Sequence, residues 1–515
     1  MNSALAIPEI LDEILQLATP STQAAAAQTC QHWSDRSLRW LWRDMESFYP
    51  LLELLSPLTC IGDTWEFSSD LSTSDWNRFS RYATRIHSLD TTLNSPYQGR
   101  EDCVVSPRIL QEFILHCPTL DSMFPKLTKV VWEPKTAANL HPILLFLVPT
   151  VKSLHLSCRR PLGEEFISIL KVLGPRGIYL TDFELTMRVC GQDFLDRLPA
   201  ILEDQKTLTS IALPPHSATR AIVAVLGQLP SLKKYTSNIY TEFQAPLEVG
   251  MEFDWNNDTF PSLERLTLYT PLANASGLVT KSHQSRLRHL ALVDRKPFSN
   301  SELLTFCSSL SASQPCLTVI DLSLYSFTTT TMISTQSIPF NYFRSLLRCA
   351  ALERLLIESH LAVGYGDNDI AAMASSWPNL QVLALCSSPA ISIGSDAGQP
   401  LRSVGTFARS FHRLAQLGIY VNSLDVGLTS DIHHRRFADI NFGTSPPPGS
   451  EDVASLYLAD EIAIGGTIRG EKGDDHVECL DSNESDEREC RYRAAYWSRV
   501  STRVQEIHAS TSHLM

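Results

Sequence analysis

The stretch Pro261-Ser262-Leu263-Glu264-Arg265-Leu266-Thr267-Leu268 carries the pattern that decides the fold. Its leucines follow the spacing Leu-x-x-Leu-x-Leu, whose last part has the period of two that is typical of a β-strand with one apolar face. The pattern recurs with first positions 23 to 35 residues apart. Clear copies begin at Val151, Leu208, Leu263, Leu287, Leu317, Leu352, Leu380 and Leu414, and weaker copies begin at Leu127, Leu180, Leu232 and Phe437.

Helical segments separate these copies. Several follow a Ser, Asp or Asn suited to cap a helix, and several end near Pro or Gly. The expected helices are Ser106–Cys117, Glu164–Leu173, Asp193–Glu203, Ala221–Leu229, Glu302–Leu310, Asn341–Ala350, Asp367–Trp377 and Arg402–His412. One strand and one helix in each unit predict an α/β fold of stacked units, an irregular β/α solenoid that resembles leucine-rich repeats. An α/β globule with coincidental leucines is the alternative, and the many phased copies disfavour it.

The first 43 residues are expected to form three short helices instead. Pro8 has its φ preset for the first turn of a helix, and carboxylates follow it where the helix dipole favours them. The second helix runs to Cys30, and the third begins near Ser34 and passes Trp42. A module of about 45 residues cannot enclose three tryptophans together with the Ile and Leu face of its first helix. Some apolar surface should therefore remain for a partner or for the rest of the chain.

This segment resembles an F-box in the order Ile7-Pro8-Glu9-Ile10-Leu11, Cys30-Gln31-His32-Trp33 and Leu41-Trp42-Arg43. The chain is similar to fungal F-box proteins with C-terminal leucine-rich repeats. The resemblance implies docking on a Skp-type adaptor and, through it, on a cullin in an SCF-type ubiquitin ligase. The residues that it assigns to adaptor binding are Ile7, Pro8, Glu9, Ile10, Leu11, Ile14, Leu15, Cys30, Trp33, Leu38 and Trp42.

The expected strands also mark a client-binding surface. Residues that flank the leucines of each copy point away from the apolar face, and aromatic and Arg side chains are common anchors of protein interfaces. An unknown client protein is expected at His155, Arg265, Tyr269, His289, Asp321, Arg354, Glu358 and Tyr420.

Composition excludes several classes of protein. A net charge of −13 and a pI near 5.6 argue against nucleic-acid binding, which needs clustered Lys and Arg. The apolar run 143–148 is too short to span a membrane, and no signal peptide is visible, so we expect a cytoplasmic or nuclear protein. The 12 cysteines lack Cys-x-x-Cys spacing, and most lie in apolar runs, as core residues do. No catalytic residues, metal ligands or cofactor are expected, and the chain should not be an enzyme.

The expected organisation has four parts. Residues 1–48 form the F-box-like module, 49–105 a linker and cap, 106–445 the solenoid, and 446–515 a C-terminal cap with an acidic loop at 471–489. The capping elements are a helix at Phe48–Leu58, a strand at 86–89, a helix at Glu451–Ile464 and a closing helix at Cys490–Ala509. A substrate-recruiting ligase subunit is the favoured function. The alternative is a leucine-rich-repeat scaffold with no role in ubiquitination.

Overall fold

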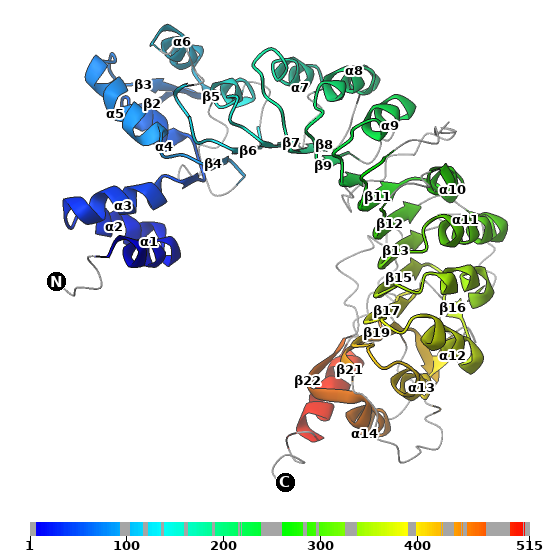
Figure 1. Ribbon diagram of the computed structural model, residues 1–515. Helices are drawn as coiled ribbons and strands as arrows, with labels where there is room; N and C mark the ends of the chain where they lie inside the picture. The colour runs from blue at the N-terminus through cyan, green and yellow to red at the C-terminus, as the bar shows by residue number, and fades with distance from the viewer. Residues whose placement is uncertain are drawn as a thin grey trace. The chain divides into compact units, whose positions relative to one another are not determined.

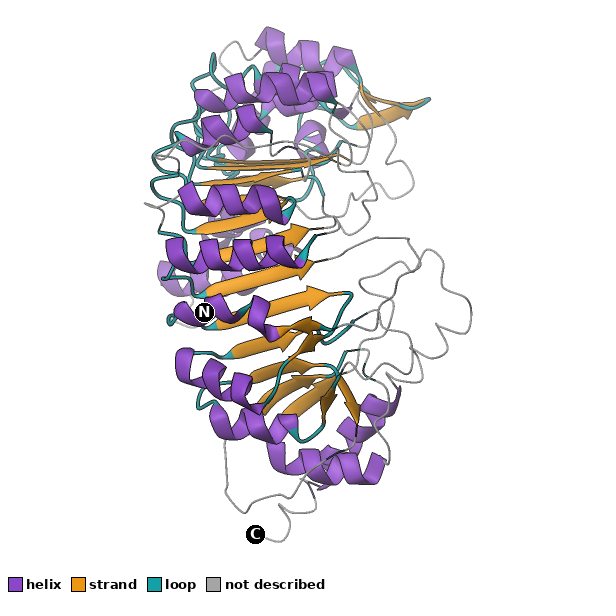
Figure 2. Ribbon diagram, turned by 90° about the vertical axis from the view of Figure 1, so that its right-hand side faces the viewer, coloured by secondary structure: helices purple, strands orange, loops and turns teal. Residues whose placement is uncertain are grey.

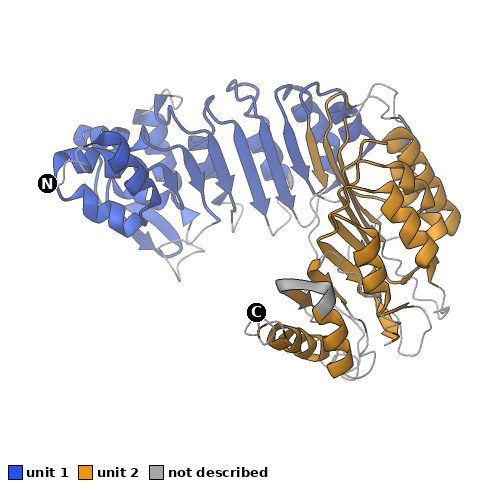
Figure 3. Ribbon diagram, turned by 60° about the horizontal axis from the view of Figure 1, so that its bottom comes forward, with its two compact units in different colours: residues 1–232 blue, residues 233–515 orange. Residues whose placement is uncertain are grey.

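The structure is a computed structural model. It describes residues 7–92, 104–116, 122–134, 139–158, 163–187, 191–214, 217, 219–237, 260–281, 286–294, 298–324, 337–389, 398–423, 425, 437–443, 445, 451–469, 495–507 and 509. The chain divides into two compact units, Met1–Leu232 (unit 1) and Lys233–Met515 (unit 2), shown in blue and orange in Figure 3. The division lies inside the expected solenoid segment, and the four-part organisation stays a prediction. Each unit is mixed α/β and contains parallel strands.

Unit 1 begins with three helices, α1 (Pro8–Leu17), α2 (Pro20–Ala27) and α3 (Gln31–Leu41), and the sequence predicts this number. The predicted bounds of the last two are wrong, because α2 ends before Cys30, and α3 begins before Ser34 and ends before Trp42. Proline occupies the first turn of both α1 and α2, and the Thr19 side chain caps α2 by accepting a hydrogen bond from a backbone N–H. Leu11, Leu15 and Ala26 form the core between the helices. This core orients α1 and fixes which of its apolar side chains stay outside.

The segment that follows is more varied than expected. The helix predicted at Phe48–Leu58 is wrong: α4 spans only Tyr49–Glu53, and residue 58 already begins a hairpin strand. The strand expected at 86–89 is present as β4, but β1 pairs with its outer edge, so β4 is not the terminal strand. The elements here are β1 (Asp44–Met45), β2 (Leu58–Ile61), β3 (Thr64–Phe67), α5 (Thr73–Ala83), β4 (Ser88–Asp90) and β5 (Val104–Val105).

The rest of unit 1 repeats a strand and a helix. Its strands lie parallel in the order β1-β4-β6-β7-β8-β9, which is the order of the chain. In Figure 1 helices α7, α8 and α9 lie along one side of β7, β8 and β9. These elements are α6 (Pro107–His116), β6 (Lys129–Trp132), η4 (His141–Leu145, a 3₁₀ helix), β7 (Ser153–Cys158), α7 (Gly163–Leu170), β8 (Asp182–Met187), α8 (Gln192–Glu203), β9 (Ser210–Leu213) and α9 (Arg220–Gly227).

Unit 2 repeats the same plan, with parallel strands in the order β10-β11-β12-β13-β15-β17-β19-β21-β22. Figure 2 shows helices ranged along one side of the strands. The strands are β10 (Lys234–Ser237), β11 (Arg265–Tyr269), β12 (His289–Asp294), β13 (Val319–Leu324), β15 (Arg354–Ser359), β17 (Val382–Leu385), β19 (Gln416–Ile419), β21 (Phe437–Asn441) and β22 (Ile462–Arg469). The helices are α10 (Leu272–Lys281), α11 (Asn300–Ser313), α12 (Asp367–Ser376), α13 (Ser403–Ser410), α14 (Glu451–Glu461) and a helix at 495–507. Two small parallel pairs complete it, β14 (Ile338–Pro339) with β16 (Val363–Gly364), and β18 (Gln399–Pro400) with β20 (Val421–Ser423).

The leucine pattern predicts the strands closely. In every copy that starts with Leu or Val, the strand begins two residues after the first position, as Leu263 and Arg265 show. The leucines inside the strands are buried, with Leu266 2% and Leu268 3% exposed. The alternation therefore sends one set of side chains into the core and leaves the other set on the opposite face of the strands.

One predicted helix is of a different kind. In place of an α-helix at Asn341–Ala350, the structure has two 3₁₀ helices, η6 (Phe340–Tyr342) and η7 (Arg344–Arg348). Phe340, Phe343, Leu346 and Cys349 are all buried and recur every third residue. A period of three matches the three residues per turn of a 3₁₀ helix, not the 3.6 of an α-helix.

Two further differences lie in unit 2. Helix α10 was not predicted, because its sequence contains Asn, Ser, Gly, Val and Thr, which are weak helix formers and give a weak helical signal. The helix predicted at Glu451–Ile464 ends at Glu461, and β-branched residues continue it as strand β22, which pairs with β21. The acidic loop 471–489 lies outside the described residues, whereas the closing helix is present at 495–507 with Tyr496, Val500 and Val504 buried.

Candidate functional site

The first candidate surface is an exposed apolar stripe on α1. Ile7, Ile10, Ile14 and Leu17 have exposed fractions of 44%, 39%, 45% and 86%. They follow one another at intervals of three and four residues, so they share one side of the helix. Leu17 was not among the predicted adaptor residues, although its spacing from Ile14 would have revealed it. We call these four residues the α1 stripe.

Other predicted adaptor residues lie inside the module. Leu11 is 0% and Leu15 1% exposed, so the expectation that Leu11 is an exposed contact is wrong. Both belong to the core between α1 and α2, against which Trp33 packs as a partly buried side chain. The sequence could not separate the two sets, because all these residues fit a single broad apolar face of the helix.

The remaining predicted adaptor residues surround this core. Pro8 is half-buried and Glu9 is exposed at the start of α1. Cys30 is the N-cap residue of α3, and Leu38 is half-buried within that helix. Trp42, just after α3, contacts Tyr82 of α5, with ring centroids 4.8 Å apart and ring planes at 44°. Trp42 therefore joins the helical module to the next part of unit 1.

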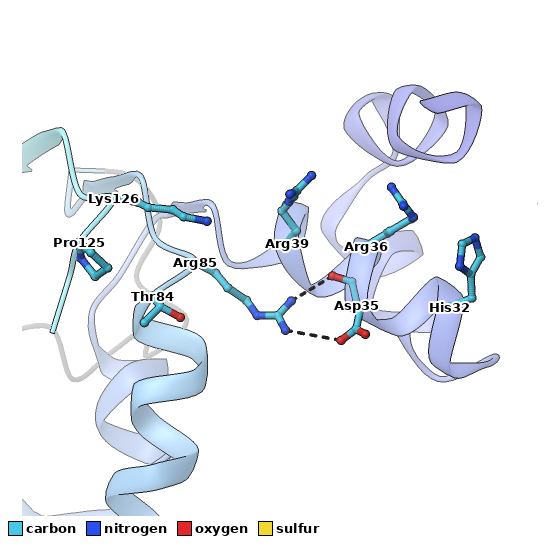
Figure 4. A pocket seen from close by; sticks show the side chains of 8 residues that line it. All are labelled: His32, Asp35, Arg36, Arg39, Thr84, Arg85, Pro125 and Lys126. Carbon is cyan, nitrogen blue, oxygen red and sulfur yellow. Dashed lines mark hydrogen bonds and ion pairs between the residues drawn. The ribbon is translucent and has the colours of Figure 1, made fainter. Parts of the chain in front are cut away.

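A pocket of about 560 Å³ lies beside α3 in the same unit. Figure 4 shows Lys126 and Arg85 extending toward α3 from the opposite wall. Arg85 Nη1 donates to the backbone carbonyl of Asp35 at 3.0 Å, and its Nη2 lies 3.6 Å from the Asp35 carboxylate. The lining residues are His32, Asp35, Arg36, Arg39, Thr84, Arg85, Pro125 and Lys126. Sequence reasoning missed this pocket because its residues come from three separate segments.

The strand face of unit 1 carries a charge cluster around His155, a predicted client-binding residue. Its Nε2 lies 2.7 Å from Asp182 Oδ2, and its Nδ1 lies 3.5 Å from Glu184. The hydrogen bond with His155, followed by those from serine hydroxyls, lowers the pKa of Asp182 to about 2. Asp182 and Glu184 were missed because their repeat copy, which begins at Leu180, is a weak one.

This cluster contains Ser, His and carboxylate groups but lacks the order of a catalytic triad. The Ser153 hydroxyl donates to Asp182 at 3.0 Å and lies 3.1 Å from His155 Nε2. A nucleophilic serine needs an imidazole nitrogen that is free to accept its proton. Asp182 is the nearer partner of that same nitrogen, at 2.7 Å, so the arrangement is a hydrogen-bonded cluster and not a triad.

The strand face of unit 2 brings together several predicted client-binding residues. Arg265 on β11 pairs in register with His289 on β12. Asp321 on β13 lies 3.6 Å from His289 and 3.4 Å from Arg354, so it lies between an imidazole and a guanidinium group. Glu358 is exposed and accepts a hydrogen bond from Ser323. Arg265 and the cluster of His289, Asp321, Arg354 and Glu358 thus present both signs of charge on neighbouring strands.

Two predicted client-binding residues are not on this surface. Tyr269 is 6% and Tyr420 7% exposed. At the end of β11 the alternation stops, because Tyr269 pairs in register with the buried Val293. Tyr420 follows β19, and its carbonyl accepts a hydrogen bond from Gln399 of the small β18–β20 pair. Their prediction as exposed anchors is wrong.

Several cysteine side chains are buried in the core, as the sequence predicts. Cys307, Cys349 and Cys386 are each 0–1% exposed, and burial raises the pKa of Cys349 to about 11. Cys117 lies outside the described residues. Among the residues that the structure describes, no group of three or more His, Cys, Asp or Glu could hold a metal ion.

No protein-family model matches this chain, and no curated protein matches it. None of the helices in the described ranges is both long and apolar enough to cross a bilayer. The class that the fold itself defines is a mixed α/β protein with a large parallel sheet.

Proposed function

We propose that this chain is a non-catalytic, substrate-recruiting subunit of an SCF-type cullin-RING ubiquitin ligase. The three N-terminal helices dock on a Skp-type adaptor, and the strand faces of a leucine-rich-repeat solenoid bind a client protein. The F-box-like order of residues in the first 43 positions, which the sequence alone provides, suggests the adaptor. The α1 stripe is the single structural observation that carries the proposal.

The stripe supports docking because the helix already has a separate core face. Leu11 and Leu15 hold α1 on its neighbours, so Ile10 and Ile14 are not needed for that packing. Fully burying an exposed isoleucine side chain contributes about 1.5–3 kcal/mol, and Ile10 and Ile14, which are 39% and 45% exposed, would each contribute a part of that value. Four such residues in one row supply the apolar centre that a specific protein interface needs.

The repeating strands support the client-binding part of the proposal. Parallel strands lie in chain order in both units, and most of them contain the leucine pattern, which is the arrangement expected of leucine-rich repeats. The charged side chains of Arg265, Asp321, Arg354 and Glu358 on β11, β13 and β15 offer complementary partners for a client surface. The chain would then accelerate ubiquitin transfer by proximity, since tethering raises the effective concentration of the client near the transferring enzyme.

Capture on a purified Skp-type adaptor tests the docking step. The intact chain should bind in stoichiometric amount, and Ile10→Asp/Ile14→Asp should lower the affinity roughly tenfold or more, because a charge enters an apolar contact. Ile114→Asp/Leu456→Asp is the matched control, since it changes two exposed apolar residues elsewhere (66% and 67% exposed). Circular dichroism establishes that all variants fold.

Loss of capture only in the α1 variant supports the proposal. If the folded intact chain is not captured, or if both variants bind as it does, adaptor docking through the stripe is wrong. The protein would then be a leucine-rich-repeat scaffold with no role in ubiquitination, and its strand faces would be the place to seek partners.

A further inference from the structure

The pocket beside α3 has an excess of positive charge in a chain that is acidic as a whole. Arg36, Arg39, Arg85 and Lys126 contribute four positive charges, whereas Asp35 in the pocket and Asp12 next to it contribute two negative ones. These groups therefore carry a net excess of two positive charges, against a net charge of −13 for the protein.

The ion pairs show how closely a carboxylate neutralises each cation of the pocket. Arg36 binds Asp12 at 2.7 Å, and Arg85 contacts Asp35. Arg39 reaches Asp12 only at 3.7 Å, and that carboxylate already serves Arg36. Lys126 is exposed and has no ion pair with any residue that the structure describes. Arg39, whose only ion pair among the described residues is the long one to a shared carboxylate, and Lys126 on the opposite wall of the pocket are therefore the least compensated cations (Figure 4).

We infer that this pocket binds a phosphoryl group, which carries close to two negative charges at neutral pH. Arginine forks and a lysine ammonium are the side chains that recognise phosphate best, and the pocket offers three of the former and one of the latter. The inference does not rest on adaptor docking.

The pocket is partly preorganised for an anion. Arg36 Nη1 also donates to the carbonyl of Pro8 at 3.3 Å, and Arg85 donates to the carbonyl of Asp35. These bonds hold two guanidinium groups in place before a ligand arrives, which lowers the entropy lost on binding. The positive charge also acts on His87 nearby. Burial, and then the positive charges of Arg43 and Lys126, lower the pKa of its imidazole.

The size of the pocket indicates that the phosphoryl group belongs to a larger ligand. A volume of about 560 Å³ is in the range of sites for whole small molecules, far larger than one phosphate ion needs. A phosphorylated side chain of a peptide and a small phosphate compound share the same recognition chemistry. The experiment must therefore separate these two sources.

Calorimetric titration of the full chain, without adaptor, tests the site. The probes are inorganic phosphate, a short peptide with one phosphoserine, and the same peptide without phosphate. Arg39→Ala/Lys126→Ala should weaken binding of the phosphorylated probes at least tenfold. Lys206→Ala/Arg344→Ala removes two positive charges from exposed positions outside the pocket and should change the affinity less than twofold.

A phosphopeptide that binds more tightly than inorganic phosphate identifies a peptide ligand, and equal affinities identify a small phosphate; both support the site. Arg39→Lys keeps the charge without the fork and should show an intermediate loss. Absence of saturable binding of both phosphorylated probes overturns the inference. Equal weakening in the pocket and control variants also overturns it, because the effect would then reflect net charge alone.

Discussion

Ile10 and Leu11 are neighbours on α1 but lie in different environments, with 39% of Ile10 and none of Leu11 exposed. Leu11 is part of the core that joins α1 to the other two helices. One turn later the same contrast returns, since Ile14 is exposed and Leu15 is buried. The helix therefore has one apolar side that holds the module together and a second that is open to a partner.

Leu11→Ala should destabilise the helical module by about 2–5 kcal/mol, because it leaves a cavity in a closed core. Ile10→Ala should cost less than about 0.5 kcal/mol, since its side chain is largely in water. Urea unfolding followed by tryptophan fluorescence measures both, because Trp33 and Trp40 pack against this core. Similar losses in the two variants would mean that α1 has no separate core side.

The sequence predicted most strands because successive side chains of a strand point to opposite faces. Buried leucines therefore alternate with residues on the other face, and this alternation is visible in the sequence. Burial at the ends of the strands escaped prediction, and Tyr269 and Tyr420 were therefore misplaced. Long-range neighbours decide those positions, such as Val293 beside Tyr269 on the adjacent strand. The pattern in one copy contains no information about what covers its end.

The candidate sites were predicted less well than the strands. The sequence pointed to α1, but the separation of Ile10 from Leu11 depends on where α2 and α3 pack. The pocket beside α3 is lined by Arg39 and Lys126, which are 87 positions apart in the sequence, and no local sequence pattern links such distant residues. The α-helix predicted at Asn341–Ala350 is replaced by 3₁₀ helices because Phe343 and Leu346, three residues apart, are both buried.

Strand β22 is held to β21 by a buried carboxylate. Arg469 Nε donates to Asp439 Oδ1 at 3.0 Å, its Nη2 donates to the other oxygen, and the Asp439 side chain is only 11% exposed. Asp439→Asn should lower the free energy of unfolding by about 1–2 kcal/mol, below the full value for a charged pair because Arg469 is 64% exposed. Urea titration measures the loss. Asp452→Asn, at a side chain 84% exposed, is the control and should change stability by less than about 0.5 kcal/mol.

The helix at 495–507 is an integral part of unit 2. Trp497 is fully buried, stacks on Phe442 with centroids 4.1 Å apart, and donates from Nε1 to the Ser445 carbonyl at 3.0 Å. Trp497→Ala should lower the free energy of unfolding by about 3–5 kcal/mol. Trp497→Phe keeps an aromatic ring against Phe442 but loses the hydrogen bond to Ser445, which contributes about 1 kcal/mol in addition to the loss from the smaller ring. Thermal unfolding with limited proteolysis measures both effects. Equal stability of the alanine variant and the parent chain would show that this helix does not close the unit.

The His155–Asp182 pair makes stability depend on pH. The pKa of Asp182 is lowered to about 2 in the folded chain, whereas an unfolded Asp has a pKa of about 3.9. The unfolded state therefore binds the proton more readily, so the contribution is fully present above about pH 4 and is lost as the pH falls toward 2. The carboxylate side chain is 37% exposed, and solvent screening limits this contribution to about 0.5–1 kcal/mol.

Urea midpoints at pH 5, 4 and 3 test this coupling in Asp182→Asn and in the parent chain. The parent should be more stable at pH 5, and the difference should shrink at each step of acidification, because the wild-type carboxyl then approaches the neutral state of the amide. Asp63→Asn, at an exposed carboxyl, should show no such trend. A difference that stays constant or grows toward pH 3 would contradict a depressed pKa at Asp182. In that case the 2.7 Å hydrogen bond to His155 would not stabilise the ionised form of the Asp182 carboxyl.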